Sequence, residues 1–193
     1  NVGPVICTEP EELIEDLDSL GMPAYDLLPM ERYGRSKYLF SPGGTTIHHG
    51  RGCTGHCSFC AFWIQMAVRR VRDGTVELKP RYRTKSAAFT ADEVEFLARR
   101  HGKRALVFVD ESFNIDPRWS DEFAGEMIRR GLKLNWFAFM RADLILRDEK
   151  LGIMEKLVRA GLAHVCIGAE RARDDDLAGM NKKFYSSETT AQV

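Results

Sequence analysis

Residues 105–167 alternate short apolar runs with amphipathic stretches at an even interval. The apolar runs begin near residues 105, 134 and 163, and a helical pattern fills each gap. This alternation predicts parallel strands joined by helical crossovers, which is an α/β fold. A doubly wound sheet and a barrel both satisfy the pattern. A further strand expected at 45–50 brings the number of strand–helix units to four.

Local signals predict where the helices begin. Thr90 and Glu93 match a capping box, so we expect a helix over 90–101. An Asp-Pro pair predicts a second helix that begins at residue 117 and stops near residue 131, and Asp148 predicts a third that ends before residue 161.

The first 44 residues are expected to form a lead-in segment. Its clearest pattern is a short amphipathic helix over 10–20. Residues 1–31 contain acidic side chains but no Lys or Arg, whereas 69–104 are rich in Arg and Lys. Because charge runs are usually solvated, we expect both to face water; the alternative is that the two stretches face each other in the fold. An Asp-Gly pair within 71–78 predicts a hairpin in what we expect to be an insertion.

Composition narrows the class of protein. The chain has 193 residues, zero formal net charge and no apolar run long enough to span a membrane, which predicts one globular domain. Three of the five cysteines are clustered, which favours a metal site over disulfides and therefore a reducing, cytoplasmic setting. Cys166 lies within an expected strand, where we predict a small core residue.

The clustered cysteines are Cys53, Cys57 and Cys60, with the spacing C-x3-C-x2-C. They are one ligand short for a tetrahedral zinc site and also for a cluster bound by four cysteines. A 4Fe-4S cluster held by three cysteines keeps one iron free for a ligand. The alternative is a zinc ion with a histidine as fourth ligand, taken from His56, His48 or His49.

The cysteine spacing, with Phe59 before the third cysteine, resembles the signature of the radical S-adenosylmethionine (SAM) superfamily. Residues 16–28 resemble the linker before the catalytic barrel of cobalamin-binding radical enzymes, and 168–183 resemble the fourth strand and turn of that branch. The resemblance implies a partial parallel (β/α) barrel, with about four of six βα units present. It divides the chain into a lead-in or linker, 1–44, and a radical SAM core, 45–193, that is incomplete at its C-terminus.

The same resemblance implies a function. The three cysteines would bind a 4Fe-4S cluster whose free iron binds SAM, and reduction would release a 5′-deoxyadenosyl radical. The electron donor would be flavodoxin- or ferredoxin-like, the substrate is unidentified, and the reaction would be a cobalamin-dependent methyl transfer. The chain has no Asp-x-His-x-x-Gly motif, so cobalamin would come from a domain outside this chain. A methylthiotransferase or a radical rearrangement or cyclisation enzyme is the alternative.

Polar residues follow all four expected strands, and ligands of parallel α/β folds bind at that edge. The resemblance assigns contacts to SAM among them: Asp110, Glu111 and Ser112 to the amino group, Arg141 to the carboxylate, Glu170 to the ribose and Phe59 to the adenine. The structural alternatives are that the two acidic residues after the second strand cap that strand, and that Arg141 pairs with Asp143 or Glu170.

A different class of function is a zinc-stabilised module whose basic segment, 69–83, binds nucleic acid. Tyr82 is the only aromatic residue in that segment, whereas single-stranded nucleic acid is usually bound by several stacked aromatic rings. The sequence therefore disfavours nucleic-acid binding.

Overall fold

The central sheet of the computed structural model, which describes residues 12–34, 43–73, 75–184 and 186–193, has four parallel strands. Their order is β1 (Gly44–Ile47), β6 (Ala105–Phe108), β7 (Asn135–Met140) and β8 (Leu162–Ile167). The order in space follows the order in the chain. A doubly wound sheet would instead reverse its strand order at a switch point. The sheet is therefore an arc of a barrel, which confirms the predicted fold class.

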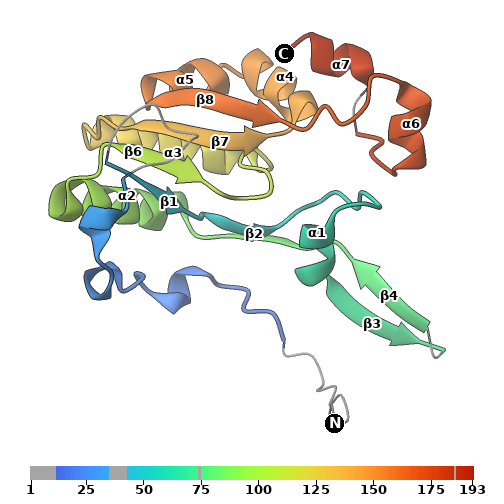
Figure 1. Ribbon diagram of the computed structural model, residues 1–193, viewed down its shortest axis with the longest axis horizontal. Helices are drawn as coiled ribbons and strands as arrows, with labels where there is room; N and C mark the ends of the chain where they lie inside the picture. The colour runs from blue at the N-terminus through green and yellow to red at the C-terminus, as the bar shows by residue number, and fades with distance from the viewer. Residues whose placement is uncertain (1–11, 35–42, 74, 185) are drawn as a thin grey trace.

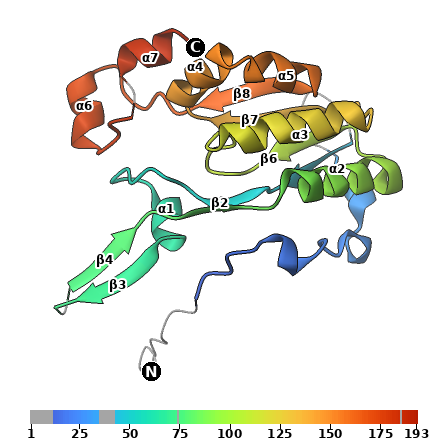
Figure 2. The same cartoon turned by 180° about the vertical axis from the view of Figure 1, so that it is seen from behind.

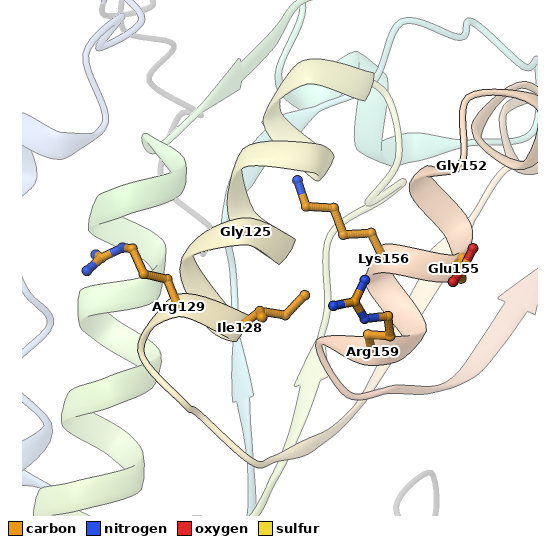
Figure 3. A pocket seen from close by; sticks show the side chains of 7 residues that line it. All are labelled: Gly125, Ile128, Arg129, Gly152, Glu155, Lys156 and Arg159. Atoms are coloured by element: carbon orange, nitrogen blue, oxygen red, sulfur yellow. The ribbon is translucent and has the colours of Figure 1, made fainter.

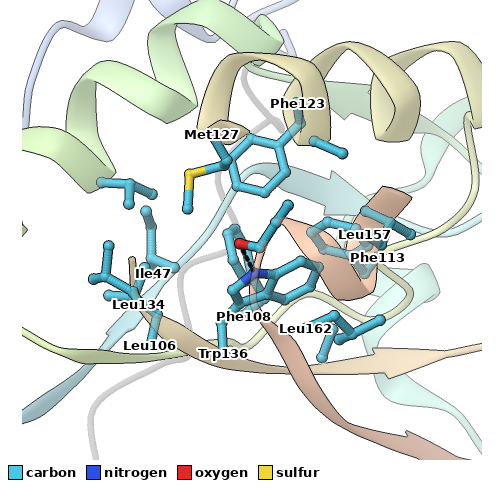
Figure 4. Close-up of a cluster of buried hydrophobic side chains, with 14 of the residues drawn as sticks. Ile47, Leu106, Phe108, Phe113, Phe123, Met127, Leu134, Trp136, Leu157 and Leu162 are labelled. Carbon is cyan, nitrogen blue, oxygen red and sulfur yellow. Dashed lines mark hydrogen bonds between the residues drawn. The ribbon is translucent and has the colours of Figure 1, made fainter. Parts of the chain in front are cut away.

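A layer of helices covers one face of this sheet. Figures 1 and 2 show α2 (Ala87–His101), α3 (Pro117–Arg129) and α5 (Ile153–Arg159) side by side against the strands. The core lies between the two layers, where Phe123 of α3 packs on Trp136 of β7 (Figure 4). Each large apolar side chain buried there contributes about 1.5–3 kcal/mol, so this interface holds the arc together.

The start of α3 agrees with the prediction, whereas the predicted start of α2 is wrong. Asp116 caps α3 by accepting a hydrogen bond from the backbone N–H of Arg118 (2.9 Å). In α2 the cap is Ser86, whose hydroxyl accepts from the N–H of Phe89 (3.1 Å). Thr90 therefore lies inside the helix, three residues after its first residue.

The third predicted helix is two helices, and its predicted start is also wrong. α4 (Ala142–Lys150) begins directly after β7, and α5 follows after a break at Gly152, whose φ of 71° is left-handed. Asp148 lies buried within α4 and accepts a hydrogen bond from Arg147 (2.8 Å). It pairs with a side chain rather than capping a helix.

The lead-in segment does not form the predicted helix. Residues 10 and 11 lie outside the described residues, and the described part contains only short 3-10 turns: η1 (Asp18–Leu20), η2 (Tyr25–Leu27) and η3 (Met30–Arg32). Its contacts explain the difference, because the carbonyl of Ile14 accepts a hydrogen bond from the guanidinium of Arg83 and the side chain of Leu17 is buried. Packing against the barrel, rather than helical periodicity, determines the path of this segment.

The acidic lead-in and the basic stretch contact each other, so the expectation that both are solvated is wrong in part. Glu15 forms an ion pair with Arg81, and the carboxylate of Asp18 accepts a hydrogen bond from the N–H of Ser86 (2.9 Å). These contacts attach the lead-in to the segment that precedes α2.

The insertion between β1 and β6 contains more structure than was expected. β2 (Gly50–Gly52) pairs antiparallel with β5 (Tyr82–Thr84), which the sequence did not indicate. Between them lie α1 (Ala61–Gln65) and the predicted hairpin, formed by β3 (Val68–Arg72) and β4 (Thr75–Lys79). Figure 1 shows the hairpin extending away from the sheet.

Two short helices complete the described chain after β8. These are α6 (Asp174–Gly179) and α7 (Ser187–Ala191). Across the described residues, none of the helices is both long and apolar enough to cross a membrane.

Candidate functional site

The cysteine loop runs from the end of β2 to the start of α1. Cys57 is buried, Cys53 and Cys60 are half-buried, and all three are free thiols. Burial raises the pKa of the Cys53 and Cys57 thiols, and the neighbouring cysteines add to that rise. The loop therefore brings together three thiols that a metal centre would bind as thiolates.

The backbone conformation of this loop depends on Gly52 and on contacts with a distant segment. Gly52 has φ of 84°, and a Cβ atom there would lie 2.0 Å from the carbonyl oxygen of Arg81. At the tip, the N–H of Ser58 donates to the carbonyl of Met180 (2.9 Å), and the amide of Asn181 donates to the carbonyl of His56 (3.1 Å). The segment after α6 therefore holds the cysteine loop in place.

A cavity of about 470 Å³ opens beside the three thiols. It lies at the carboxyl ends of β6, β7 and β8, the edge where parallel α/β folds bind ligands. The structure brings all nine residues proposed from the sequence to its walls: Cys53, Cys57, Phe59, Cys60, Asp110, Glu111, Ser112, Arg141 and Glu170. Their shared position is a finding, whereas their roles as ligands stay predictions.

The donor set fits an iron–sulfur cluster better than a single metal ion. Four ligands around one zinc ion must all lie within about 2.3 Å of it. Among the described residues, no group of three or more His, Cys, Asp or Glu side chains is arranged to hold one ion. His48, His49 and His56 do not line the cavity. Three thiols at the wall of one cavity suit a cluster in which each thiolate binds a different iron.

Asp110 is buried and its carboxylate already has protein partners. It accepts hydrogen bonds from the N–H of Gly50 (2.6 Å) and the N–H of His49 (3.1 Å), and it lies 3.0 Å from the Nδ1 atom of His49. Burial alone would raise the pKa of Asp110, but the charge and hydrogen bonds of His49 and the N–H of Gly50 lower it overall. Asp110 thus attaches β2, which leads into the cysteine loop, to the end of β6.

His49 extends this contact to the insertion. Its Nε2 atom lies 3.1 Å from the hydroxyl of Tyr82 in β5, and its ring stacks on Trp119 with centroids 4.0 Å apart. The side chain is completely buried. The role of His49 in holding β2, β5 and β6 together could not be read from the sequence, because its three partners are distant in the chain.

Glu111 and Ser112 differ in their surroundings. Burial raises the pKa of Glu111, and the charge of Asp110 adds to that rise. Among the described residues, no side-chain donor bonds its carboxylate. Ser112 is buried, and its hydroxyl donates to the amide oxygen of Asn114 (3.2 Å).

Arg141 is held by its neighbours, as the structural alternative anticipated. Its Nε and Nη2 atoms bond both carboxylate oxygens of Asp143 (3.0 and 2.6 Å), and its Nη1 atom donates to the hydroxyl of Thr54 (3.2 Å). The guanidinium also lies 4.0 Å from the ring centroid of Phe184. Arg141 remains at the cavity wall, and its partner Thr54 directly follows Cys53 in the chain.

Glu170 pairs with Lys182, which the sequence did not identify as a site residue. The Nζ atom of Lys182 donates to Glu170 (3.0 Å) and to the carbonyl of Gly168 (2.6 Å). Glu170 has φ of 60°, and a Cβ atom at Gly168 would lie 2.9 Å from that Nζ atom. The positive charge of Lys182 also opposes the rise in the pKa of Cys57. Its partners lie 14 and 12 residues earlier in the chain, so no local signal identified it.

We expect Lys182→Met to destabilise the protein by about 1–2 kcal/mol, because it leaves the carbonyl of Gly168 and the carboxylate of Glu170 without their cation. Lys183→Met removes an exposed cation at the next position and should change the free energy of unfolding by less than about 0.5 kcal/mol. Urea denaturation of both variants measures the difference. Equal stability of the two variants would show that Lys182 is not a structural tether.

Cys166 and Phe59 both lie at the cavity rather than in the core. Cys166 was predicted to be a core residue, which is wrong: it is exposed on β8 and lines the cavity. β8 is the last strand of the arc, so no further described strand covers it. Phe59 is 49% exposed, and its ring centroid lies 5.9 Å from the Nζ atom of Lys182.

A second hollow, of about 370 Å³, lies within the helical layer between α3 and α5 (Figure 3). Two of its cations have partners, because Lys156 pairs with Asp121 and Arg129 pairs with Glu126. It has no cysteine or histidine in its lining and contains none of the predicted site residues. The predicted site residues therefore line the cysteine cavity and not this hollow.

Curated relatives match most of this chain. Anaerobic magnesium-protoporphyrin IX monomethyl ester cyclase of Rubrivivax gelatinosus is 33% identical over 184 residues, which is 94% of this chain and 29% of that protein. Hopanoid C-3 methylase of Methylococcus capsulatus is 24% identical over 90% of this chain and 30% of its own. The chain thus spans about 30% of the length of these curated relatives.

The fold has a counterpart among solved structures. The cobalamin-dependent S-adenosylmethionine radical enzyme OxsB, with aqua-cobalamin bound, superposes with a TM-score of 0.58 and 20% identity. The superposition covers 75% of this chain and 20% of that one. This likeness supports the partial-barrel fold. Residues 47–193 match the Radical SAM superfamily, a range that includes all three cysteines and the described strands that follow β1. The chain belongs to that superfamily of enzymes.

Proposed function

We propose that this chain is the catalytic core of an enzyme that binds a 4Fe-4S cluster through Cys53, Cys57 and Cys60 and reductively cleaves SAM. The observation that carries the proposal is the single cavity shared by the three thiols and by the polar ends of β6, β7 and β8. A cluster with one iron free would supply an electron to bound SAM and release a 5′-deoxyadenosyl radical.

The residues of this chain would hold and orient that cofactor. Glu111 is the best placed acceptor for the methionine ammonium, since the carboxylate of Asp110 is occupied by His49 and Gly50. Asp110 and Ser112 complete the amino-group side of the site. Arg141 would pair with the methionine carboxylate while sharing its guanidinium with Asp143.

The other end of SAM would lie toward β8. Glu170 would accept hydrogen bonds from the ribose hydroxyls, with Lys182 holding its carboxylate in place. Phe59 would pack against the adenine. The rest of the wall includes Phe62, Phe139 and Phe184, whose apolar surfaces would exclude water from a reactive radical.

The complete protein would be a cobalamin-dependent methyltransferase, with cobalamin bound by a domain outside this chain and 1–44 as the linker to it. The likeness to Hopanoid C-3 methylase and to the cobalamin-dependent OxsB supports this assignment. A radical cyclisation is the second candidate, because three curated relatives are named as magnesium-protoporphyrin monomethyl ester cyclases, one of them 33% identical. Methylthiotransfer remains the other alternative.

The proposed chemistry requires a low-potential electron donor of the flavodoxin or ferredoxin type. It also requires a reducing compartment such as the cytoplasm, because free thiols and an open cluster site are vulnerable to oxidation.

The direct test is the formation of 5′-deoxyadenosine by the reconstituted complete protein with SAM and dithionite under anaerobic conditions. We expect at least one equivalent per protein within an hour. Formation of methylated product or of S-adenosylhomocysteine would identify methyl transfer, and a dehydrogenated, ring-closed product without transferred methyl groups would identify cyclisation. A cluster-loaded protein that produces no 5′-deoxyadenosine would contradict the proposal.

A further inference from the structure

The β3–β4 hairpin is a basic ribbon that projects beside the cysteine loop. Arg70 and Arg72 lie on one strand and Lys79 on the other, with Arg70 opposite Glu77 in the register. Side chains alternate between the faces of a strand, so these four charged residues share one face. All are exposed, and no carboxylate of a described residue lies within ion-pair distance of the three cations.

This charged face forms one side of a groove whose other side is the cysteine loop and the first turn of α1. The groove has a volume of about 430 Å³ and is lined by Arg70, Glu77 and Lys79 together with His56 and Trp63. It shares no lining residue with the cavity that contains the thiols. The ribbon therefore presents its positive charge on the outer surface of the loop.

Trp63 connects the groove to the cysteines. Its indole N–H donates to the carbonyl of Cys57 (2.9 Å), and its ring lies edge-on to that of His56, with centroids 6.3 Å apart. His56 itself stands between Cys53 and Cys57 in the chain. A redox centre docked in this groove would be separated from a cysteine ligand by one aromatic side chain.

We propose that this groove, from the basic face of the ribbon to Trp63, is the docking surface for an acidic flavoprotein that supplies the electron. This inference rests on the proposed function and adds the place where its partner binds. In each transfer one electron leaves the reduced flavin of the partner and is taken up by the cluster, so the flavin is oxidised by one electron. Unpaired cations at the rim would steer a negatively charged partner and raise its association rate.

The surface suits a protein better than a nucleic acid. The groove is also lined by Leu78 and Pro80, which add apolar surface beside its charged residues. Protein interfaces combine apolar contacts with a charged rim. The ribbon itself contains no aromatic side chain on which bases could stack.

The test compares two electron sources in the complete, cluster-reconstituted protein. In the triple variant Arg70→Glu, Arg72→Glu, Lys79→Glu we expect the flavodoxin concentration at half-maximal 5′-deoxyadenosine formation to rise about tenfold or more. Reduced flavodoxin, its reductase and NADPH are the donor system. With dithionite, which needs no docking, the variant should match the parent protein within about twofold. Added salt should weaken flavodoxin binding to the parent protein and have less effect on the variant.

A matched control reverses three exposed cations of the helical side: Arg100→Glu, Lys133→Glu and Lys150→Glu. Equal loss in both triple variants, no loss in either, or an equal loss with dithionite would overturn the docking proposal. Loss of affinity for a single-stranded RNA with unchanged flavodoxin binding would also overturn it and assign the ribbon to nucleic acid. If the parent protein forms no 5′-deoxyadenosine with dithionite, the proposed function fails, and direct flavodoxin binding to the two variants still decides the docking surface.

Discussion

Cys57→Ala is expected to reduce the iron bound after anaerobic reconstitution from about four per protein to less than about one. Cys57 is the buried member of the triad, so removing its thiolate leaves two ligands for a cluster that needs three. Iron and sulfide analysis with a visible spectrum measures the loss. The expected loss is large because Cys166, the other cysteine at the cavity, lies on β8 rather than in the loop that holds the remaining two thiolates.

Cys166→Ala provides the matched control. Cys166 lines the same cavity but lies on β8 rather than in the cysteine loop. Its replacement by alanine is therefore expected to leave the iron content unchanged. Retention of four irons in Cys57→Ala together with their loss in Cys166→Ala would assign the cluster to a different set of cysteines.

Asp110→Asn is expected to destabilise the protein by about 3 kcal/mol at pH 7. The carboxylate that pairs with His49 is completely buried, and removal of one partner of a buried pair leaves the other unsatisfied. Urea denaturation of the variant and of the exposed-site control Asp26→Asn gives the two free energies of unfolding.

The same pair predicts a pH dependence with a definite sign. The pKa of Asp110 in the folded protein lies below its ordinary value of 3.8, so its ionisation stabilises the folded state. That contribution is complete above the ordinary value and is lost as the pH falls through the lower folded value. The stability difference between parent protein and Asp110→Asn should therefore shrink in strongly acidic buffer. A difference that is constant down to the lowest pH at which the protein folds would show that charge does not carry the contribution of Asp110.

The strands and the start of α3 were predictable because their signals are local. The apolar runs that became β6 and β7 are largely buried, whereas Leu162 is the buried residue of the edge strand β8. Asp116 caps α3, and a proline follows it as the first residue of the helix. Patterns and contacts within a few positions of each other in the sequence determine these elements.

The errors occur where distant residues determine the local structure. Glu93 matched a capping box, but in the fold it is buried and accepts hydrogen bonds from Tyr25 and Lys85. Its partners in the lead-in and before α2 draw it into the core, and Ser86 caps the helix instead. In the same way, the contact of Arg83 with the carbonyl of Ile14 is made by a distant residue within the range where the lead-in helix was predicted.

The location of the site was predictable from the positions of its residues at the ends of parallel strands. Residues that follow strands meet at one edge, so the nine proposed residues reached a common cavity. Lys182 was missed, and His49 was considered only as a possible zinc ligand. Each acts through partners in other segments of the chain, Lys182 through Glu170 and His49 through Asp110 and Tyr82.

The measurement that tests the central claim most directly is the electron paramagnetic resonance spectrum of the reconstituted, dithionite-reduced protein, recorded with and without SAM. A cluster held by three cysteines has an iron that SAM can reach, so we predict the signal of a reduced 4Fe-4S cluster whose shape changes when SAM is added. A protein that contains zinc and shows no such signal, or one whose signal is unaffected by SAM at millimolar concentration, would contradict the account.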